Sequence, residues 1–193
     1  MDLLSALRER PVIAAIRDVT CPNIPAWDRI GVLFVLGGTI FDLPRIVEQA
    51  HRYEKLVFAD IDLVKGIGKD AAGVRFLARE SHVDGIITTR SNLIKSVHGE
   101  GLAAIERIFA LDSESLGGGL GVVEKSGPDA VEILPGLIVS KIIKKIRALT
   151  SIPVIAGGLI TQEEHIQEIL AAGAIGVSTS ASHLFSRDAT KMP

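Results

Sequence analysis

Short apolar segments recur along the whole chain, and polar or helix-patterned stretches separate them. Each is rich in valine, isoleucine, alanine or leucine, as expected for strands that are buried on both faces of a parallel sheet. The pattern therefore predicts eight strands. They are Val12–Ile16, Val32–Leu36, Leu56–Asp62, Gly85–Thr89, Leu102–Ile108, Ala130–Leu134, Val154–Ala156 and Ile175–Thr179.

Amphipathic helices are predicted between these strands. In the range 42–54 apolar residues recur at helical spacing, and Asp42 is the expected N-cap. The range 137–149 has a similar apolar stripe. After the seventh strand, Thr161–Glu164 has the sequence of a capping box, and Gly173 occupies the position of a C-terminal cap.

The segment Ser113–Lys125, after the fifth strand, is the weakest helical candidate. It contains four glycines, and each glycine inside a helix costs about 1 kcal/mol relative to alanine. The sequence therefore predicts that this helix is short or mobile.

Alternating strands and helices without a break in composition predict one α/β domain, residues 1–193, folded as a (β/α)₈ barrel of the TIM type. Its repeats average about 23 residues, against roughly 31 in a typical barrel, so either the helices are short or one or two of them are reduced to turns. An open doubly wound sheet is the alternative. That fold would place a glycine-rich phosphate turn after the first strand, where the sequence has Arg17-Asp18-Val19-Thr20.

The two last repeats have the features of a phosphate site at strands 7 and 8. Gly157 and Gly158 follow the seventh strand, where the absence of a Cβ lets the backbone approach an anion. Thr179 and Ser180 follow the eighth strand and precede a short helical segment whose amides would face the same anion. A tight turn alone would also explain the glycine pair, but its combination with the hydroxyl run favours phosphate.

Charged side chains at the other predicted strand ends form a second candidate set. Functional residues of this fold lie at the carboxyl ends of the strands, and three arginines, one lysine and four carboxylates meet there. This mixture suits a ligand with both charge and hydroxyls, whereas mutual ion pairs at the top of the barrel are the structural alternative. The set is Arg17, Asp60, Asp62, Lys65, Arg90, Glu106, Arg107 and Glu132.

Composition narrows the possible partners. The net charge of −2 gives no overall attraction to nucleic acid, and an aromatic content of 4% provides no stacking platform for RNA. A basic stripe on one predicted helix is the local candidate for an RNA surface, although such runs are usually solvated faces. The stripe comprises Lys141, Lys144, Lys145 and Arg147.

The sequence also indicates where the protein acts. Cys21 is the single cysteine, so no intrachain disulfide can form and a cytoplasmic location is expected. The N-terminal stretch is too charged for a signal peptide, and no apolar run reaches the roughly 18 residues of a membrane span. The scattered histidines form no metal-ligand pair. We therefore expect no metal, no cofactor and no catalytic triad.

Several of these segments resemble, in order, the glycerol uptake operon antiterminator regulatory proteins. The resemblance extends over nearly the whole chain, and its most specific runs are Glu132-Ile-Leu-Pro-Gly136 and Ala156-Gly-Gly-Leu-Ile160. The other matching runs are Pro11–Arg17, Asp62–Gly68, Gly85–Arg90, Glu106–Ser113 and Ala172–Ser180. At Ala59-Asp60, Glu106 and Gly117–Gly121 the chain departs from the pattern common in the family.

The resemblance implies a regulator without catalytic residues, which responds to glycerol 3-phosphate and binds the leader mRNA of glycerol-utilisation genes. It is compatible with a homodimer and implies no membrane partner. The ligand site implied comprises Arg17, Asp62, Arg90, Arg107, Glu132, Gly157, Gly158, Thr179 and Ser180, with Lys65 beside it.

An enzyme of the same fold is the competing hypothesis. It would be an isomerase or aldolase acting on a triose or sugar phosphate, in which Asp60 or Asp62 acts as a base together with Lys65. The many arginines of the mouth, without a residue set apart as a base, favour the regulator.

Overall fold

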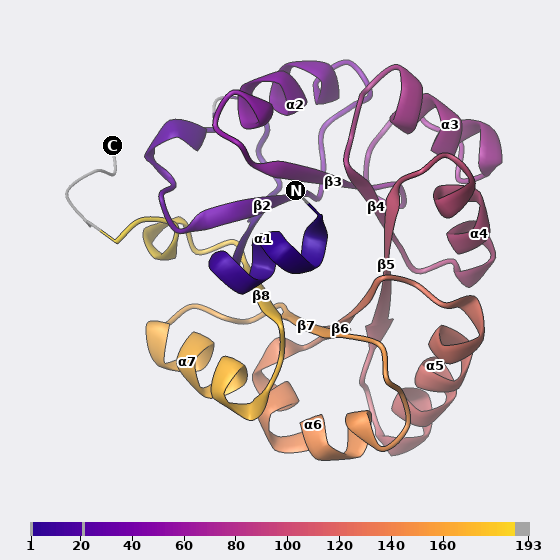
Figure 1. The fold of residues 1–193 in the computed structure, drawn as a ribbon, viewed down its shortest axis with the longest axis vertical. Coiled ribbons are helices and arrows are strands. Elements are labelled where there is room, and N and C mark those ends of the chain that lie inside the picture. The colour runs from indigo at the N-terminus through magenta and orange to yellow at the C-terminus, as the bar shows by residue number, and fades with distance from the viewer. Residues whose placement is uncertain (1, 21, 188–193) are drawn as a thin grey trace.

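Eight parallel strands form a closed barrel in which each strand pairs with its neighbours in sequence order (Figure 1). The structure is a computed structural model that describes residues 2–20 and 22–187, so Cys21 lies outside the described residues. The (β/α)₈ prediction is thereby confirmed. The strands are β1 (Val12–Ile16), β2 (Ile30–Val35), β3 (Leu56–Asp60), β4 (Gly85–Thr88), β5 (Ala103–Phe109), β6 (Ala130–Leu134), β7 (Val154–Gly157) and β8 (Gly176–Thr179).

Helices surround the barrel, and most have only 7 to 10 residues, as the short repeats predict. Within residues 17–20, 22–29 and 180–187, 3₁₀ turns and no α-helix follow β1 and β8, namely η1 (Ile24–Ala26) and η3 (Ser182–Leu184), as the prediction of one or two reduced helices allows. A third turn, η2 (Gly136–Ile138), follows β6. The helices are α1 (Leu3–Glu9), α2 (Leu43–His51), α3 (Ala71–Arg79), α4 (Ser91–Gly99), α5 (Ser113–Ser126), α6 (Val139–Arg147) and α7 (Glu163–Ala172).

Helix α1 was not predicted, and it lies across the amino-terminal end of the barrel, at the centre of Figure 1. Its Leu3, Ala6 and Leu7 are buried and belong to the apolar cluster inside the barrel. Asp2 caps the helix by accepting a hydrogen bond from the Ser5 backbone N–H over 2.9 Å. The helix therefore closes this end, and the opposite end, formed by the carboxyl ends of the strands, remains the mouth.

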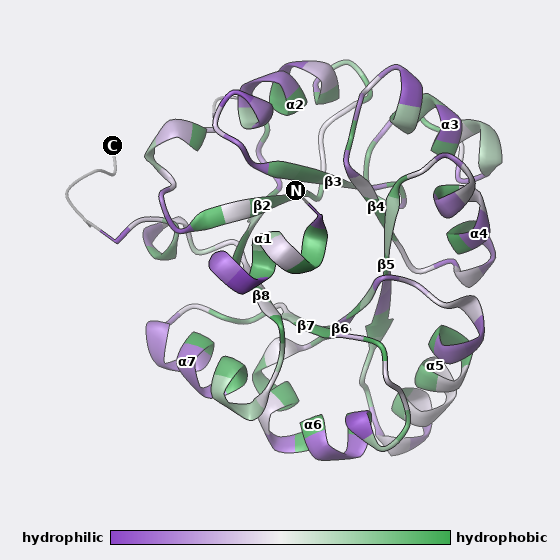
Figure 2. Ribbon diagram, in the orientation of Figure 1, coloured by the Kyte–Doolittle hydropathy of each residue, from purple (hydrophilic) through white to green (hydrophobic). Residues whose placement is uncertain are grey.

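Strand alternation separates two apolar regions. One cluster fills the barrel and includes Phe34, Phe58 and Ile105, while the other lies between the barrel and the helices. Figure 2 shows the same division on the helices, whose apolar faces turn inward. Because successive residues of a strand point to opposite faces, the position of a residue along its strand decides whether its side chain enters the barrel.

Helix α5 is a full helix of 14 residues, so the prediction of a short or mobile segment is wrong. Asp112 accepts hydrogen bonds from the backbone N–H groups of Glu114 and Ser115, and Ser115 accepts one from the Asp112 N–H, which forms a reciprocal capping box. Gly127 ends the helix in the left-handed conformation, at φ 66°. Caps and a buried stripe outweigh the glycines. The stripe consists of Leu116, Leu120 and Val123.

The other predicted helix ends have mixed outcomes. Gly173 is the C-cap of α7, at φ 112°, as predicted. Asp42 occupies the N-cap position of α2, but its side chain accepts hydrogen bonds from Thr39 instead of capping the helix. The capping box predicted at 161–164 is wrong, because α7 begins at Glu163, whose carboxylate pairs with Arg29 over 2.6 and 2.8 Å.

Among the described residues, no helix has both the length and the apolar character needed to span a bilayer.

Replacing Asp112 with alanine should destabilise α5 more than the rest of the fold. The change removes the acceptor of two helix N–H groups, and loss of such a cap costs about 1 kcal/mol. Hydrogen exchange of α5 amides should accelerate, and denaturant unfolding should report the lost stability. Glu114→Gln, in the same turn, is the matched control because the Glu114 side chain does not cap the helix. Unchanged α5 exchange in Asp112→Ala would contradict the role of the cap.

Candidate functional site

A cavity of about 260 Å³ opens at the mouth of the barrel, between the ends of β1, β2 and β5–β8. Six of the residues that the sequence selects line it, namely Arg17, Arg107, Glu132, Gly158, Thr179 and Ser180. Asp62, Lys65, Arg90 and Gly157 do not line the cavity. The structure therefore brings the phosphate end together with only part of the charged set.

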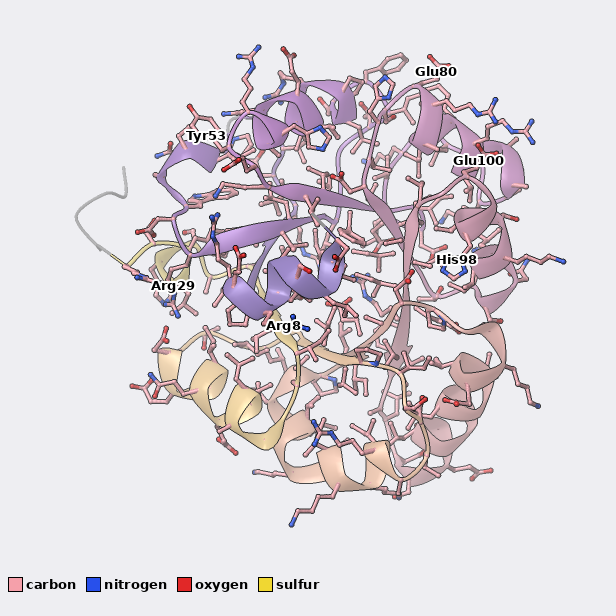
Figure 3. All side chains as sticks on the ribbon, viewed as in Figure 1. Arg8, Arg29, Tyr53, Glu80, His98 and Glu100 are labelled. Carbon is pink, nitrogen blue, oxygen red and sulfur yellow. The ribbon has the colours of Figure 1, made fainter. Side chains whose placement is uncertain are left out.

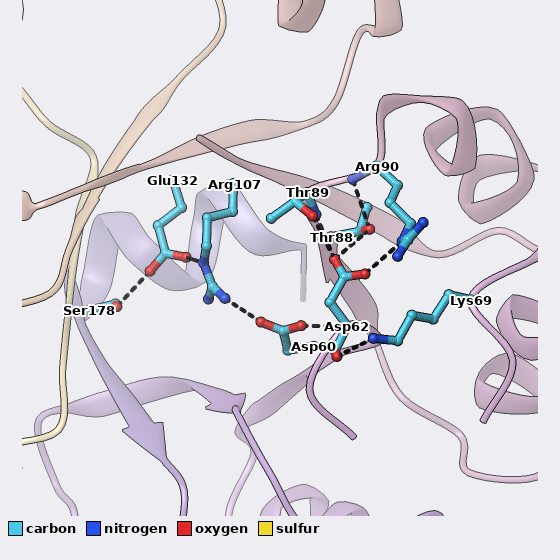
Figure 4. A network of polar contacts seen from close by, with 9 residues as sticks. All are labelled: Asp60, Asp62, Lys69, Thr88, Thr89, Arg90, Arg107, Glu132 and Ser178. Atoms are coloured by element: carbon cyan, nitrogen blue, oxygen red, sulfur yellow. Dashed lines mark hydrogen bonds and ion pairs between the residues drawn. The ribbon is translucent and has the colours of Figure 1, made fainter. Parts of the chain in front are cut away.

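The floor of the cavity carries a buried ionic network (Figure 4). Arg107 Nε donates to Glu132 Oε2 over 2.6 Å, and Arg107 Nη1 donates to Asp60 Oδ2. Ser178 Oγ donates to the other Glu132 oxygen, Oε1, over 2.7 Å. All four side chains are less than a tenth exposed. They meet because each is at an inward-facing position of its strand, on β3, β5, β6 and β8.

Charge in this network is not balanced, because one guanidinium faces two carboxyl groups. Burial raises the pKa of Asp60 above its ordinary value, and the nearby Arg107 charge only partly offsets this. Burial alone would lower the pKa of Arg107, but the charges of Glu132 and Asp60 outweigh it and raise that pKa. Arg107 therefore stays a cation, and the network keeps it in one place.

Asp62 and Arg90 extend this network beyond the cavity, because the Asp62 backbone N–H donates to Asp60 Oδ1 over 3.0 Å (Figure 4). Asp62 lies in the turn after β3 and accepts hydrogen bonds from Thr88 Oγ1, the Thr89 N–H and Arg90 Nε, the last over 2.9 Å. Burial would raise the pKa of Asp62, but these hydrogen bonds outweigh it and lower that pKa. This pair joins the loops after β3 and β4. It is therefore one of the mutual ion pairs at the top of the barrel that were the structural alternative to a ligand site.

Lys65 likewise stabilises the loops through its backbone and does not contribute its side chain to the cavity. Its backbone N–H donates to Gly38 and its carbonyl accepts from Ile40, over 3.0 Å each, so that it joins the loops after β2 and β3. Its side chain does not line the cavity.

Glu106 does not belong to the mouth, contrary to the sequence-based expectation. It precedes Arg107 on β5, so its side chain points away from the barrel interior, where it accepts a hydrogen bond from Ser126 at the end of α5. Burial raises its pKa. The residue is part of the layer between barrel and helices, and a departure from the family pattern at this position does not alter the cavity.

The glycine pair after β7 serves two different purposes. A Cβ on Gly157 would lie 2.3 Å from Glu132 Oε1, so only glycine leaves room for the buried carboxylate. Gly158 has φ 82° and Leu159 has φ 63°, and both line the cavity. Left-handed backbone is unusual for leucine, and such outliers cluster at ligand sites. The Leu159 side chain is 69% exposed at the edge of the opening.

Backbone donors line the β7–β8 side of the cavity. Within the described residues, the N–H groups of Gly158, Leu159 and Ser180 donate to no acceptor. The Thr179 hydroxyl, in contrast, donates to the Ile160 carbonyl over 2.6 Å and accepts from the Ala181 N–H, so it fixes the loop geometry. Free main-chain N–H groups with a nearby Arg17 form a site suited to an anion.

The predicted basic stripe lies on the outer wall, away from the mouth. Lys141, Lys144 and Lys145 are exposed on α6, whereas Arg147 Nη2 donates to the Gly173 carbonyl over 2.8 Å. Helix α7, which packs beside α6, presents Glu168 to Ser140. The stripe is therefore exposed throughout, with three lysines and a bonded arginine beside an acidic neighbour.

Two of the histidines form hydrogen bonds with aspartates on the outer surface of the protein. His98, which is labelled in Figure 3, pairs with Asp129 over 3.0 Å, and His51 pairs with Asp84 over 2.9 Å. Among the described residues no cluster of three or more histidine, cysteine or acidic side chains could hold a metal ion.

Sequence reasoning missed Ser178 and Leu159 as cavity residues. Ser178 belongs to the hydroxyl run that the sequence selects, but its inward direction depends on the barrel register, in which it lies opposite Gly157. Leu159 follows the glycine pair directly, and only its backbone conformation shows that it lines the opening.

Comparison with known proteins identifies the family. A family model described as "Glycerol-3-phosphate responsive antiterminator" matches residues 12–185. The chain belongs to this family. It is 34% identical to the uncharacterized protein YgcP of Escherichia coli (strain K12), over 93% of this chain and 94% of that protein.

Two solved structures agree with this assignment. The glycerol uptake operon antiterminator regulatory protein from Listeria monocytogenes is 34% identical, with a TM-score of 0.82 over 91% of this chain and 94% of that one. A glycerol uptake operon antiterminator-related protein from Thermotoga maritima is 33% identical, with a TM-score of 0.80 over 91% and 98%. The resemblance deduced from the sequence motifs is therefore confirmed.

The two glycines after β7 should respond differently to alanine. Gly158→Ala places its Cβ no closer than 3.5 Å to Leu134, so its cost is the left-handed backbone, about 1–2 kcal/mol. Gly157→Ala forces its Cβ against Glu132 and should cost more than Gly158→Ala. Urea unfolding of both variants measures the difference. Equal costs would show that Glu132 is not held against this backbone.

Proposed function

We propose that this chain is a transcription antiterminator of the cytoplasm that senses glycerol 3-phosphate and binds the leader mRNA of glycerol-utilisation genes. The observation that carries the proposal is the cavity of this family member, which is lined both by residues with unpaired main-chain N–H groups and by a buried carboxylate and guanidinium. An anion and hydroxyl groups on one small molecule match these two sides.

In this proposal the phosphate lies against the loops after β7 and β8. The N–H groups of Gly158, Leu159 and Ser180 would donate to its oxygens, and Arg17 would add a positive charge. The glycerol hydroxyls would then face Glu132 and Arg107 on the floor. Thr179 and Gly157 support this site without a side-chain contact to the ligand.

The arrangement of possible catalytic groups favours a sensor over an isomerase or aldolase. Asp60 is 1% exposed and is bonded to Arg107, and Asp62 is bonded to Arg90. Lys65 does not line the cavity. A base and an electrophile must both reach the substrate, and none of these three side chains is placed to do so.

Binding of a leader transcript should depend on glycerol 3-phosphate, and the protein should not consume that compound. Native gel mobility of the transcript, with and without the ligand, measures the first, and quantification of glycerol 3-phosphate over time measures the second. Gly158→Asp should abolish the ligand effect, because it places a carboxylate in the anion site. Gly121→Asp, where a Cβ meets open space on α5, is the matched control. Consumption of the ligand would instead identify an enzyme.

We propose the exposed lysines of α6 as the RNA surface because of their positive charge. Reversing Lys144 and Lys145 to glutamate should weaken transcript binding at least about tenfold at low salt, since phosphate contacts dominate such affinity and fall steeply with salt. The gel shift should be repeated over a range of salt concentrations. Unchanged retention of the transcript by this variant would exclude the α6 stripe as the RNA surface.

A further inference from the structure

The cavity floor presents hydrogen-bond acceptors and donors side by side. Each Glu132 oxygen receives one hydrogen bond, from Arg107 Nε or from Ser178 Oγ. A carboxylate oxygen has two lone pairs, so each has one accepting position left. Arg107 uses Nε and Nη1 within the network, and a guanidinium has five N–H donors in all. Both residues line the cavity.

An alcohol satisfies such a floor better than a carbonyl group does. A hydroxyl can donate to Glu132 and at the same time accept from Arg107, whereas a ketone can only accept. A ketone facing Glu132 leaves the buried carboxylate without its donor and places the partial negative charge of the ketone oxygen against the charged carboxylate oxygen. Loss of a hydrogen bond to a buried charged group is costly, because the group cannot recover water as a partner. Sites built to bind a hydroxyl therefore reject analogues that lack it.

The floor cannot easily rearrange to accept a ketone. Arg107 is held by carboxylates on both sides, Glu132 and Asp60. Glu132 Oε1 is in turn confined by Gly157, since even a Cβ at that position would lie 2.3 Å away. Glu132 is also about 1% exposed. Its acceptors are therefore fixed in direction before any ligand arrives.

From this geometry we infer that Glu132 makes the sensor selective for an alcohol over a ketone in its ligand. Arg107, Ser178 and Gly157 hold Glu132 in the orientation that this selectivity needs. Glu132 accepts hydrogen bonds from both glycerol hydroxyls, so a polyol phosphate binds and the ketone with the same carbon chain and phosphate is rejected. The inference rests on the proposed function, because it takes the ligand to be a phosphate held at β7 and β8. Glu132 is thus a specificity-determining residue.

Isothermal titration calorimetry with glycerol 3-phosphate and with dihydroxyacetone phosphate tests this. The two differ only in the alcohol or ketone at the middle carbon. The unmodified protein should bind glycerol 3-phosphate at least about tenfold more tightly, as loss of a charged hydrogen bond predicts. Glu132→Gln should reduce the ratio to about threefold or less, because the amide can donate to a carbonyl oxygen.

Glu106→Gln is the matched control for this experiment. It makes the same chemical change at another buried glutamate, whose side chain points away from the cavity toward Ser126. The ratio of affinities should therefore stay at the value of the unmodified protein. If Glu132→Gln fails to fold, Glu132→Asp keeps the charge but withdraws it by one methylene, and should weaken glycerol 3-phosphate while leaving the ketone unaffected.

The outcomes separate the inference from the proposed function. Affinities within about threefold of each other in the unmodified protein would overturn the inference, while binding of both phosphates would still support the sensor. A ratio that persists in Glu132→Gln, or that falls equally in Glu106→Gln, would also overturn it. If neither glycerol 3-phosphate nor dihydroxyacetone phosphate binds, the proposed function and this inference are both overturned.

Discussion

Arg107, held between Asp60 and Glu132 inside the barrel, is the interaction on which the functional end of this protein depends. Burying charges is expensive unless they are paired and hydrogen-bonded, and here the strands bring three of them to one level. The network converts the end of an apolar barrel into a polar floor. It also fixes the direction of Glu132, and through Glu132 it requires a glycine at position 157.

The remaining parts of the mouth can be understood from this constraint. The opposite side of the mouth differs from this floor, because the N–H groups of Gly158, Leu159 and Ser180 after β7 and β8 have no acceptor among the described residues. Gly158 and Leu159 keep that loop in a left-handed conformation. Helix α1 covers the other end of the barrel, and residues of the floor and of the β7–β8 loops together line the cavity at the mouth.

Much of the fold could be predicted because it depends on local pattern. Apolar runs buried on both faces predict parallel strands, and the eight predicted strands all exist. The errors concern helix boundaries, caps and buried contacts that the apolar pattern alone does not contain. Helix α5 persists despite its glycines because Asp112 caps it and the barrel buries its stripe. The capping box before α7 is absent because the N-cap is Gln162 and not Thr161, so the helix begins one residue later than the box requires.

By itself the sequence determined the family, the barrel and the chemistry available at its mouth, because these follow from motifs and from residues near strand ends. Only the tertiary structure decided which charges share a space. Glu106 and Arg107 are adjacent in the sequence, but strand alternation sends one toward α5 and the other into the barrel. Asp60 and Asp62 likewise pair with different arginines, Arg107 and Arg90, although the Asp62 backbone N–H donates to Asp60 Oδ1. The physical reason is that barrel closure, which sets register and direction together, is a property of all eight strands and not of any one segment.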